Sequence, residues 1–392
     1  MGTAENSKTS SKLSSWLALF VSREWEGRDP VIDQFRGLAI IAMIMVNHRP
    51  PTDSVFSPFL HAEWTGWTLA DTVFPMFLFI VGLSISYFHR PQPKHDEVYL
   101  YARIVRRSAL LIVIGILLAN FPYYELEKLQ IHGTLQRIGI CYLAVALINR
   151  FAGLRTHVAI IIVVLATYHW LLVRFHVPDF GPGVLTPEGN VSTYLDSLIL
   201  GDYAQHFQRG GPVTQGLLPT ASAIASTLAG LVAGYWLKHQ TTITSQALGL
   251  FAVGFLFLCG GALWSLLVPI SKPLWTPSYV VLMVGVAAQV LAFLYWVHQH
   301  DLAGILQRFF QIAGANAITF FVLAQIFQRV LVYGRIPLAD GSTPRLRYLI
   351  YEHAFQSWLP GKIAALAYTL CFLAICYAVI FEMYRKRVFI KL

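Results

Sequence analysis

The chain has 392 residues, of which 56% are hydrophobic and only 12% are charged, and its formal net charge is +9. Soluble globular domains carry roughly a quarter charged residues, so this composition excludes a water-soluble globule and a disordered chain. The sequence therefore predicts an integral membrane protein with many spans. In such proteins an excess of Lys and Arg is typical of cytoplasmic loops, so no nucleic-acid partner is expected.

The first 30 residues are expected to form a cytoplasmic N-terminal segment. Residues 1–15 are polar, and the apolar run at 16–21 is too short for the core of a signal peptide. The segment is predicted to be either amphipathic at a membrane surface or disordered. Residues 31–392 are expected to form one transmembrane domain.

Ten stretches have the length and apolar character of membrane-crossing helices, which need about 20 mainly apolar residues. They lie at residues 35–51, 68–88, 103–121, 134–151, 157–174, 215–237, 246–269, 277–297, 309–333 and 362–384. This pattern predicts an all-α fold, a polytopic transmembrane helix bundle of about ten spans. An even number of spans places both termini on the same side of the membrane.

The distribution of Lys and Arg predicts which side that is. If the N-terminus is cytoplasmic, 18 of these cations lie in cytoplasmic segments and nine lie in the opposite loops. Cytoplasmic loops carry the excess of Lys and Arg in membrane proteins, so both termini are expected in the cytoplasm.

The four cysteines all lie within apolar runs and form no Cys-x-x-Cys pair. This spacing indicates neither a zinc site nor a disulfide framework. No metal is expected.

Residues 60–71 hold the densest group of polar side chains beside a predicted span. Trp64 and Trp67 are typical of a membrane interface, and Gly66 permits a sharp bend. His61 is therefore expected on a segment that folds back toward the bundle, with Asp71 one turn into the second span. Ionisable groups at the centre of a span cost roughly 2.5–3.5 kcal/mol and are functional candidates by default.

Two interpretations of this segment remain open. Thr68 and Asp71 fit a capping box at the start of a helix, and a histidine at the interface is commonly just a wet surface residue. Alternatively, Asp71 orients His61 as a general base or nucleophile, while Asn47 donates a hydrogen bond to the developing oxyanion. Spacing alone does not decide between them.

Several further segments, taken in order, carry a family resemblance. They are Ile32–Leu38, Met45–Asn47, His61–Trp64, Asp71–Gly82, Gly133–Gly139, Tyr194–Asp196, Leu200–Asp202, Leu274–Val280 and Gly314–Ile318. This ordered set resembles the heparan-alpha-glucosaminide N-acetyltransferase family, including its bacterial relatives, from about residue 30 to the C-terminus. The block with His61 ten residues before Asp71 is its most specific part.

The resemblance implies an enzyme that moves an acetyl group from cytoplasmic acetyl-CoA to the amine of a glucosamine-type sugar on the other side of the membrane. It places the catalytic roles on His61, Asp71 and Asn47. The sequence departs from the family at residues 130–133, which read Gln-Ile-His-Gly where the family often has Arg-Ile-Pro-Gly. Such differences put the identity of the acceptor, more than the reaction, in question. The expected acceptor is an amino sugar or an envelope glycan, and the expected location is a bacterial inner membrane.

The remaining candidates are assigned by charge and by the family motifs. The residues expected to bind acetyl-CoA are Arg36, Arg103, Arg106, Arg107 and Arg137. Anchoring of cytoplasmic loops explains the first four equally well, and Arg137 is expected to pair with an acid first. The residues expected to bind the acceptor are Asn120, Gln136, Asp202 and Asn316. A homodimer is compatible with the resemblance.

Two other functions stay open at this point. One is a transporter for an amino sugar or oligosaccharide, which embedded polar groups suit equally well. The other is O-acetylation of an envelope polysaccharide.

Overall fold

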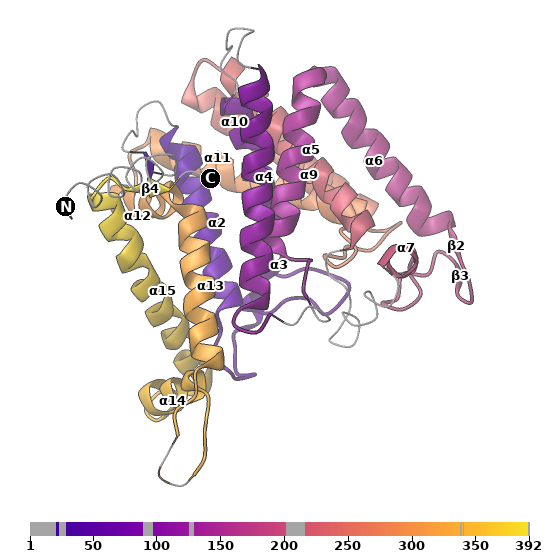
Figure 1. The fold of residues 1–392 in the computed structure, drawn as a ribbon. Helices are drawn as coiled ribbons and strands as arrows, with labels where there is room; N and C mark the ends of the chain where they lie inside the picture. The colour runs from indigo at the N-terminus through magenta and orange to yellow at the C-terminus, as the bar shows by residue number, and fades with distance from the viewer. Residues whose placement is uncertain are drawn as a thin grey trace, which may run out of the picture. The chain divides into compact units, whose positions relative to one another are not determined.

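The computed structural model describes residues 21–22, 29–88, 97–124, 129–200, 216–337, 339 and 341–390. Within these ranges the chain is mostly helical, and Figure 1 labels the elements. The predicted helical fold class is confirmed. Most of the expected N-terminal segment, and Asp202, lie outside the described residues.

Each of the ten predicted spans coincides with a helix or a pair of helices. The long helices are α2 (Pro30–Asn47), α3 (Leu69–Phe88), α4 (Glu97–Asn120), α5 (Thr134–Phe151), α6 (Leu154–Arg174), α9 (Leu217–His239), α10 (Ile243–Trp264), α11 (Pro277–Gln299), α12 (Gly304–Ala315), α13 (Ala317–Tyr333) and α15 (Gly361–Arg385). The short elements are η1 (Ser57–Phe59), α7 (Val191–Leu200), α14 (Leu346–Tyr351), η4 (Glu352–Gln356) and two antiparallel strand pairs, β1 (Val21–Ser22) with β4 (Phe389–Ile390) and β2 (His176–Val177) with β3 (Gly181–Pro182).

Seven helices in the described part of the chain are long and apolar enough to cross a membrane, namely α2, α3, α6, α9, α10, α11 and α15. The pair α12 and α13, bent by 77°, makes an eighth if it is one broken span. Helices α4 and α5 are not among them, because α4 carries three arginines and α5 carries Gln136, Arg137, Asn149 and Arg150. The chain is an integral membrane protein, whereas ten spans and the side of the termini stay predictions.

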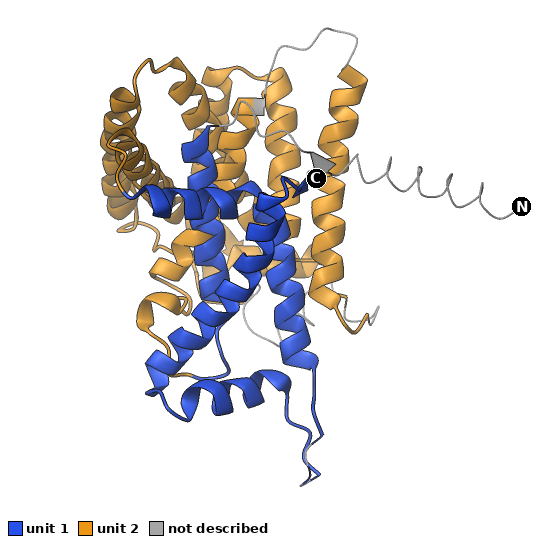
Figure 2. Cartoon of the chain, turned by 90° about the vertical axis from the view of Figure 1, so that its left-hand side faces the viewer, with its two compact units in different colours: residues 1–52, 303–392 blue, residues 53–302 orange. Residues whose placement is uncertain are grey.

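Contacts divide the chain into two compact units, coloured separately in Figure 2. Unit 1 comprises residues 1–52 and 303–392, and unit 2 comprises residues 53–302. The single transmembrane domain expected at 31–392 stays a prediction.

In unit 1, the span predicted at 309–333 is broken at Asn316, between α12 and α13. The buried Asn316 amide donates to the carbonyl of Val388 at 3.0 Å, and its oxygen accepts from the N–H of Ile390 at 3.1 Å. A helix break leaves backbone groups without partners, and these bonds join the break to the β4 segment. Asn316 therefore has a structural role here, and its predicted contact with the acceptor stays a prediction.

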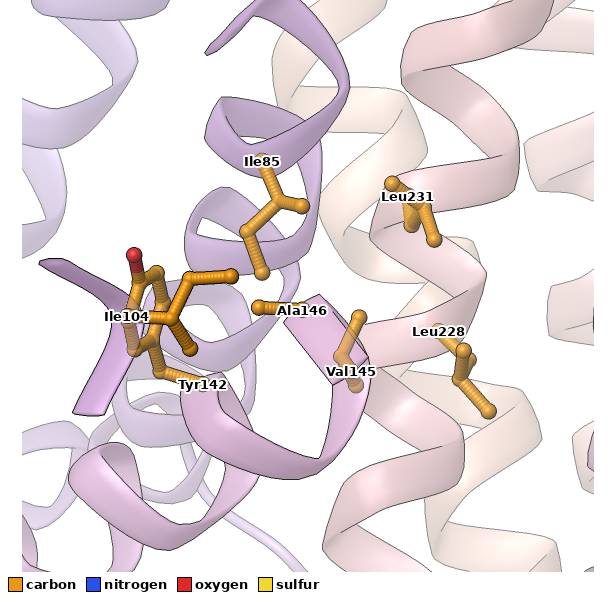
Figure 3. Close-up of a cluster of buried hydrophobic side chains, with 7 residues drawn as sticks. All are labelled: Ile85, Ile104, Tyr142, Val145, Ala146, Leu228 and Leu231. Atoms are coloured by element: carbon orange, nitrogen blue, oxygen red, sulfur yellow. The ribbon is translucent and has the colours of Figure 1, made fainter. Parts of the chain in front are cut away.

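In unit 2, helices α3, α4, α5 and α9 share one apolar core (Figure 3). Its buried members are Ile85, Ile104, Tyr142, Val145, Ala146, Leu228 and Leu231. Lipid tails are as apolar as these side chains, so helix association in a membrane depends on close packing rather than on burial from water. Small residues at the crossings are therefore expected to matter most.

The crossing of α3 and α9 depends on two glycines. A Cβ atom at Gly82 would lie 1.8 Å from the carbonyl oxygen of Thr227, and one at Gly230 would lie 2.0 Å from that of Phe79. Both distances are far below van der Waals contact with rigid backbone. Only glycine at these two positions allows the backbones to approach this closely.

Replacing Gly82 by alanine is expected to destabilise the folded protein by about 1–3 kcal/mol, because the helices must separate to admit the methyl group. The matched control is Gly260→Ala in α10, where a Cβ would meet only Val281 at 3.7 Å. Thermal unfolding in detergent measures both variants. Equal unfolding temperatures for the two variants would contradict the packing argument.

Unit 2 has two ends that can be identified from its contacts. At the His61 end, segment 60–68 meets the loop 265–276 through the bond from Gly66 N–H to the carbonyl of Ile270 at 2.7 Å. At the Lys238 end, the ammonium of Lys238 donates to the carbonyl of Ser86, and the hydroxyl of Tyr235 donates to Asn149 at 2.8 Å. Helix α3 runs between them over about 30 Å, which matches the hydrocarbon thickness of a bilayer.

Candidate active site

His61 and Asp71 form a hydrogen-bonded pair at the His61 end of unit 2. The Nδ1 atom of His61 lies 2.7 Å from Oδ1 of Asp71. The Asp71 side chain is completely buried, whereas that of His61 is 38% exposed. No residue described in unit 2 bonds Nε2 of His61. With Nδ1–H donating to the carboxylate, the lone pair of Nε2 is available to an outside group.

The second carboxylate oxygen of Asp71 holds the start of α3 in place. Oδ2 accepts from the backbone N–H groups of Ala62 and Thr68, each at 3.0 Å. The Thr68 hydroxyl donates to the carbonyl of Leu60 at 2.6 Å. The capping interpretation and the catalytic interpretation are therefore compatible, since each uses a different oxygen of the same carboxylate.

A lysine that the sequence analysis counted only as a loop cation is the third member of the cluster. The ammonium of Lys272 lies 3.1 Å from Oδ1 of Asp71 and 3.1 Å from Nδ1 of His61. Burial lowers the pKa of Lys272, and the charge and hydrogen bond of Asp71 oppose that shift. Asp71 Oδ1 thus faces two nitrogen donors at once.

Tyr279, in the first turn of α11, contacts the backbone of the cluster. Its buried hydroxyl donates to the backbone carbonyl of Asp71 at 2.6 Å. Neither Tyr279, within the family segment Leu274–Val280, nor Lys272 is among the site residues expected from the sequence. The available signal is a lysine two residues before a family motif, in a loop between two predicted spans.

Arg137 lies at the same end, near the start of α5. It is buried, and its guanidinium sits 5.2 Å from the ring centre of Trp275. It also interacts electrostatically with Asp196 of α7, an acid whose pKa is raised by burial while the Leu217 N–H and Arg137 oppose the rise. The expected pairing of Arg137 with an acid and its contact with acetyl-CoA both stay predictions.

The two predicted acceptor-binding amides of this region differ in how far they are already occupied. Asn120 donates to the carbonyls of Ile116 and Gln130 and accepts from the Gln130 N–H, so its amide ties α4 to the following loop. Gln136 is buried, and its Nε2 has no hydrogen-bond partner among the described residues. The contacts of Asn120 and Gln136 with the acceptor stay predictions.

The three arginines of α4 are nearer the Lys238 end. Arg107 lies over the ring of Tyr142 at 4.8 Å, Arg106 is exposed and Arg103 is half-buried. They are thus separated along the helix axes from His61 and Arg137. The residues of unit 2 that are expected to bind acetyl-CoA therefore form two groups, the three arginines of α4 toward the Lys238 end and Arg137 at the His61 end.

Two predicted site residues besides Asn316 belong to unit 1. Arg36 forms an ion pair with Asp33 at 2.5 Å, and Asn47 is the exposed last residue of α2. Their roles with acetyl-CoA and with the oxyanion stay predictions.

The comparisons with known proteins address this same region. The sequence model described as "Heparan-alpha-glucosaminide N-acetyltransferase, catalytic" matches residues 28–201, which include His61, Asp71 and Arg137. The heparan-alpha-glucosaminide N-acetyltransferases of Homo sapiens and Mus musculus are each 28% identical to the chain over 92% of its length. The chain is similar to heparan-alpha-glucosaminide N-acetyltransferase. The resemblance inferred from the sequence is confirmed.

The match with the heparan-alpha-glucosaminide N-acetyltransferases is partial on their side. The aligned part of the chain spans 59% of the human protein and 60% of the mouse protein. Lys272 and Tyr279 lie beyond the residues that the catalytic model matches.

Proposed function

We propose that this protein is a transmembrane acetyl-CoA-dependent N-acetyltransferase that acts on the amine of a glucosamine-type sugar. The observation that carries the proposal is the His61–Asp71 pair at 2.7 Å, with Nε2 of His61 available to an outside group. The similarity to the heparan-alpha-glucosaminide N-acetyltransferases supports the acetyl donor and the class of acceptor. The proposed location is a bacterial inner membrane.

In the proposed reaction the acceptor amine attacks the thioester carbonyl of acetyl-CoA. Nε2 of His61 takes a proton from the amine, the C–N bond forms, the C–S bond breaks, and the proton passes to the leaving thiolate. Asp71 keeps the Nδ1–H tautomer and stabilises the imidazolium. In the two-step version Nε2 itself attacks the thioester, the C–S bond breaks and CoA leaves as the thiolate. The amine then attacks the acetyl group, the bond from the acetyl carbon to Nε2 breaks, and the proton of the amine is taken up by the thiolate.

The cations of unit 2 support the proposed orientation. Of its described Lys and Arg residues, six lie toward the Lys238 end and three toward the His61 end. The excess of Lys and Arg is characteristic of the cytoplasmic side. We therefore place the Lys238 end in the cytoplasm, as cytoplasmic termini require, and the acceptor at the His61 end.

Acetyl-CoA enters from the cytoplasm in this proposal. Arg103, Arg106 and Arg107 supply positive charge for its phosphates, with charge-assisted hydrogen bonds. From Arg106 to the far end of α4 is about 20 Å along the helix, a distance comparable with the reach of an extended pantetheine arm.

Replacing Arg106 by glutamine is expected to raise the KM for acetyl-CoA about tenfold and to leave kcat unchanged, because a hydrogen bond to a charged group contributes about 1.5–3 kcal/mol. Arg155→Gln is the matched control, since Arg155 is an exposed arginine toward the same end. Initial rates at varied acetyl-CoA concentration measure both. The same KM in the two variants would assign Arg106 to membrane anchoring alone.

The function itself is tested in proteoliposomes with acetyl-labelled acetyl-CoA. Free glucosamine, chitosan oligomers and peptidoglycan fragments are offered as acceptors, and an amide-linked acetyl product is expected with at least one of them. Sugar uptake without acetyl-CoA and without any product would support the transporter instead. Labelling of hydroxyl groups alone would support O-acetylation.

A further inference from the structure

Lys272 has its position fixed by the backbone around it. The Ser271 hydroxyl donates to the carbonyl of Trp64 at 2.8 Å, and the Gly66 N–H donates to the carbonyl of Ile270 at 2.7 Å. These bonds join the loop 265–276 to the segment that carries His61. The ammonium of Lys272 is therefore held at the cluster by the fold, and its side chain is only 22% exposed.

The hydrogen-bond roles in the cluster make the contact between Lys272 and His61 repulsive in one protonation state. Asp71 Oδ1 is the acceptor for both nitrogens, at 2.7 Å from His61 and 3.1 Å from Lys272. The two nitrogens are 3.1 Å apart. When His61 is neutral, the lysine and the aspartate balance each other's charge. When His61 is protonated, two cations share one carboxylate.

The other ionisable groups around the pair do not remove this repulsion. Arg137 of α5 adds positive charge and acts electrostatically on Lys272. Tyr279 of α11 is a buried neutral phenol bonded to the Asp71 backbone. Glu63, on the segment of His61 itself, is exposed, where water screens its charge.

We infer that Lys272 is a positioning residue that keeps His61 unprotonated and thereby sets the lower pH limit of acetyl transfer. Asp71 alone would fix the tautomer but would also favour the imidazolium form, which cannot accept a proton. With Lys272 present, Asp71 still orients the His61 ring, while the ammonium offsets the negative charge of the carboxylate. This inference rests on the proposed role of His61 as base or nucleophile.

The test reads the imidazole directly and needs neither acetyl-CoA nor an acceptor. Diethyl pyrocarbonate modifies neutral imidazole, and peptide mass spectrometry gives the rate at His61 between about pH 5 and 8, where imidazoles change charge. The full-length protein in detergent is compared with Lys272→Met, Lys272→Arg and Lys362→Met. Lys362 is an exposed lysine in the first turn of α15.

In Lys272→Met the midpoint of His61 modification is expected to rise by about one pH unit, the size of a unit charge at 3 Å even with the dielectric constant of water. The acid side of the pH–rate profile of acetyl transfer is expected to move to higher pH by the same amount. Lys272→Arg is expected to restore the wild-type midpoint, and Lys362→Met to leave it unchanged. An unchanged midpoint in folded Lys272→Met would overturn the inference.

The modification and transfer assays separate the two proposals. A shifted midpoint in a protein that transfers no acetyl group to any acceptor would retain the role of Lys272 and reject the proposed function. Loss of transfer in both Lys272 variants with no shifted midpoint would make the lysine purely structural.

Discussion

Replacing His61 by alanine is expected to reduce the rate of acetyl transfer by about 10²–10⁴-fold, the range that a positioned acid–base group contributes. The reason lies in the pair at 2.7 Å, which leaves Nε2 of His61 for the proton transfer proposed above. Asp71 and Lys272 cannot replace it, since one is completely buried and the other is bonded to it. The KM for acetyl-CoA is expected to change little.

The measurement is the initial rate of labelled amide formation by purified protein. His176→Ala is the matched control, because His176 is an exposed histidine of the same unit, in β2, and it should keep the wild-type rate. Intact-mass analysis after acetyl-CoA addition distinguishes the two reaction schemes. An acetylated wild-type protein, with no such species in His61→Ala, supports the two-step version.

A wild-type rate in folded His61→Ala would remove His61 from the mechanism. An equal loss in His176→Ala would point to a general effect of replacing histidines in this unit.

The spans were predictable from hydrophobicity, but their ends were less so. The first span was placed at 35–51, whereas α2 begins at Pro30, with Asp29 capping the N–H of Val31 at 2.9 Å. The span predicted at 35–51 leaves out Asp33 and Gln34. Both lie buried within unit 1, where Oδ1 of Asp33 pairs with Arg36. The helix is therefore longer than the apolar stretch that predicts it, because its first residues are buried by packing that hydrophobicity alone does not show.

The break at Asn316 was hidden for a related reason. Residues 309–333 are apolar enough to suggest one span, and the bend of 77° depends on hydrogen bonds to residues more than 70 positions away. Hydrophobicity carries no information about such partners.

The His61–Asp71 pair of the candidate site was predictable from the sequence, and the third member of the cluster was not. His61 and Asp71 are ten residues apart on one bend, and the family resemblance indicates them where spacing alone does not decide. Lys272 is separated from His61 by more than 200 residues, and only the pairing of two loops brings it close. Because a lysine in a loop is usually a surface charge, the sequence alone does not indicate that Lys272 contacts His61 and Asp71.

Replacing Asp71 by asparagine is expected to reduce acetyl transfer by at least 10²-fold and up to about 10⁴-fold, as in catalytic triads whose aspartate becomes an amide. The prediction follows from the donors that surround the carboxylate. Oδ2 faces the N–H groups of Ala62 and Thr68, which both require an acceptor. An asparagine must therefore turn its oxygen toward them and its NH₂ toward His61.

That NH₂ group would face Nδ1 of His61 and the ammonium of Lys272, two donors that had shared an acceptor. His61 can relieve the clash only by accepting at Nδ1, which moves its proton to Nε2 and removes the lone pair that takes the proton from the amine. Asp179→Asn is the control, because Asp179 is exposed with φ of 67°, a conformation that asparagine tolerates. A folded Asp71→Asn protein within about threefold of the wild-type rate would contradict the tautomer argument. Asparagine fills the same space as aspartate, so the argument rests on the changed hydrogen-bond donors and not on an empty position.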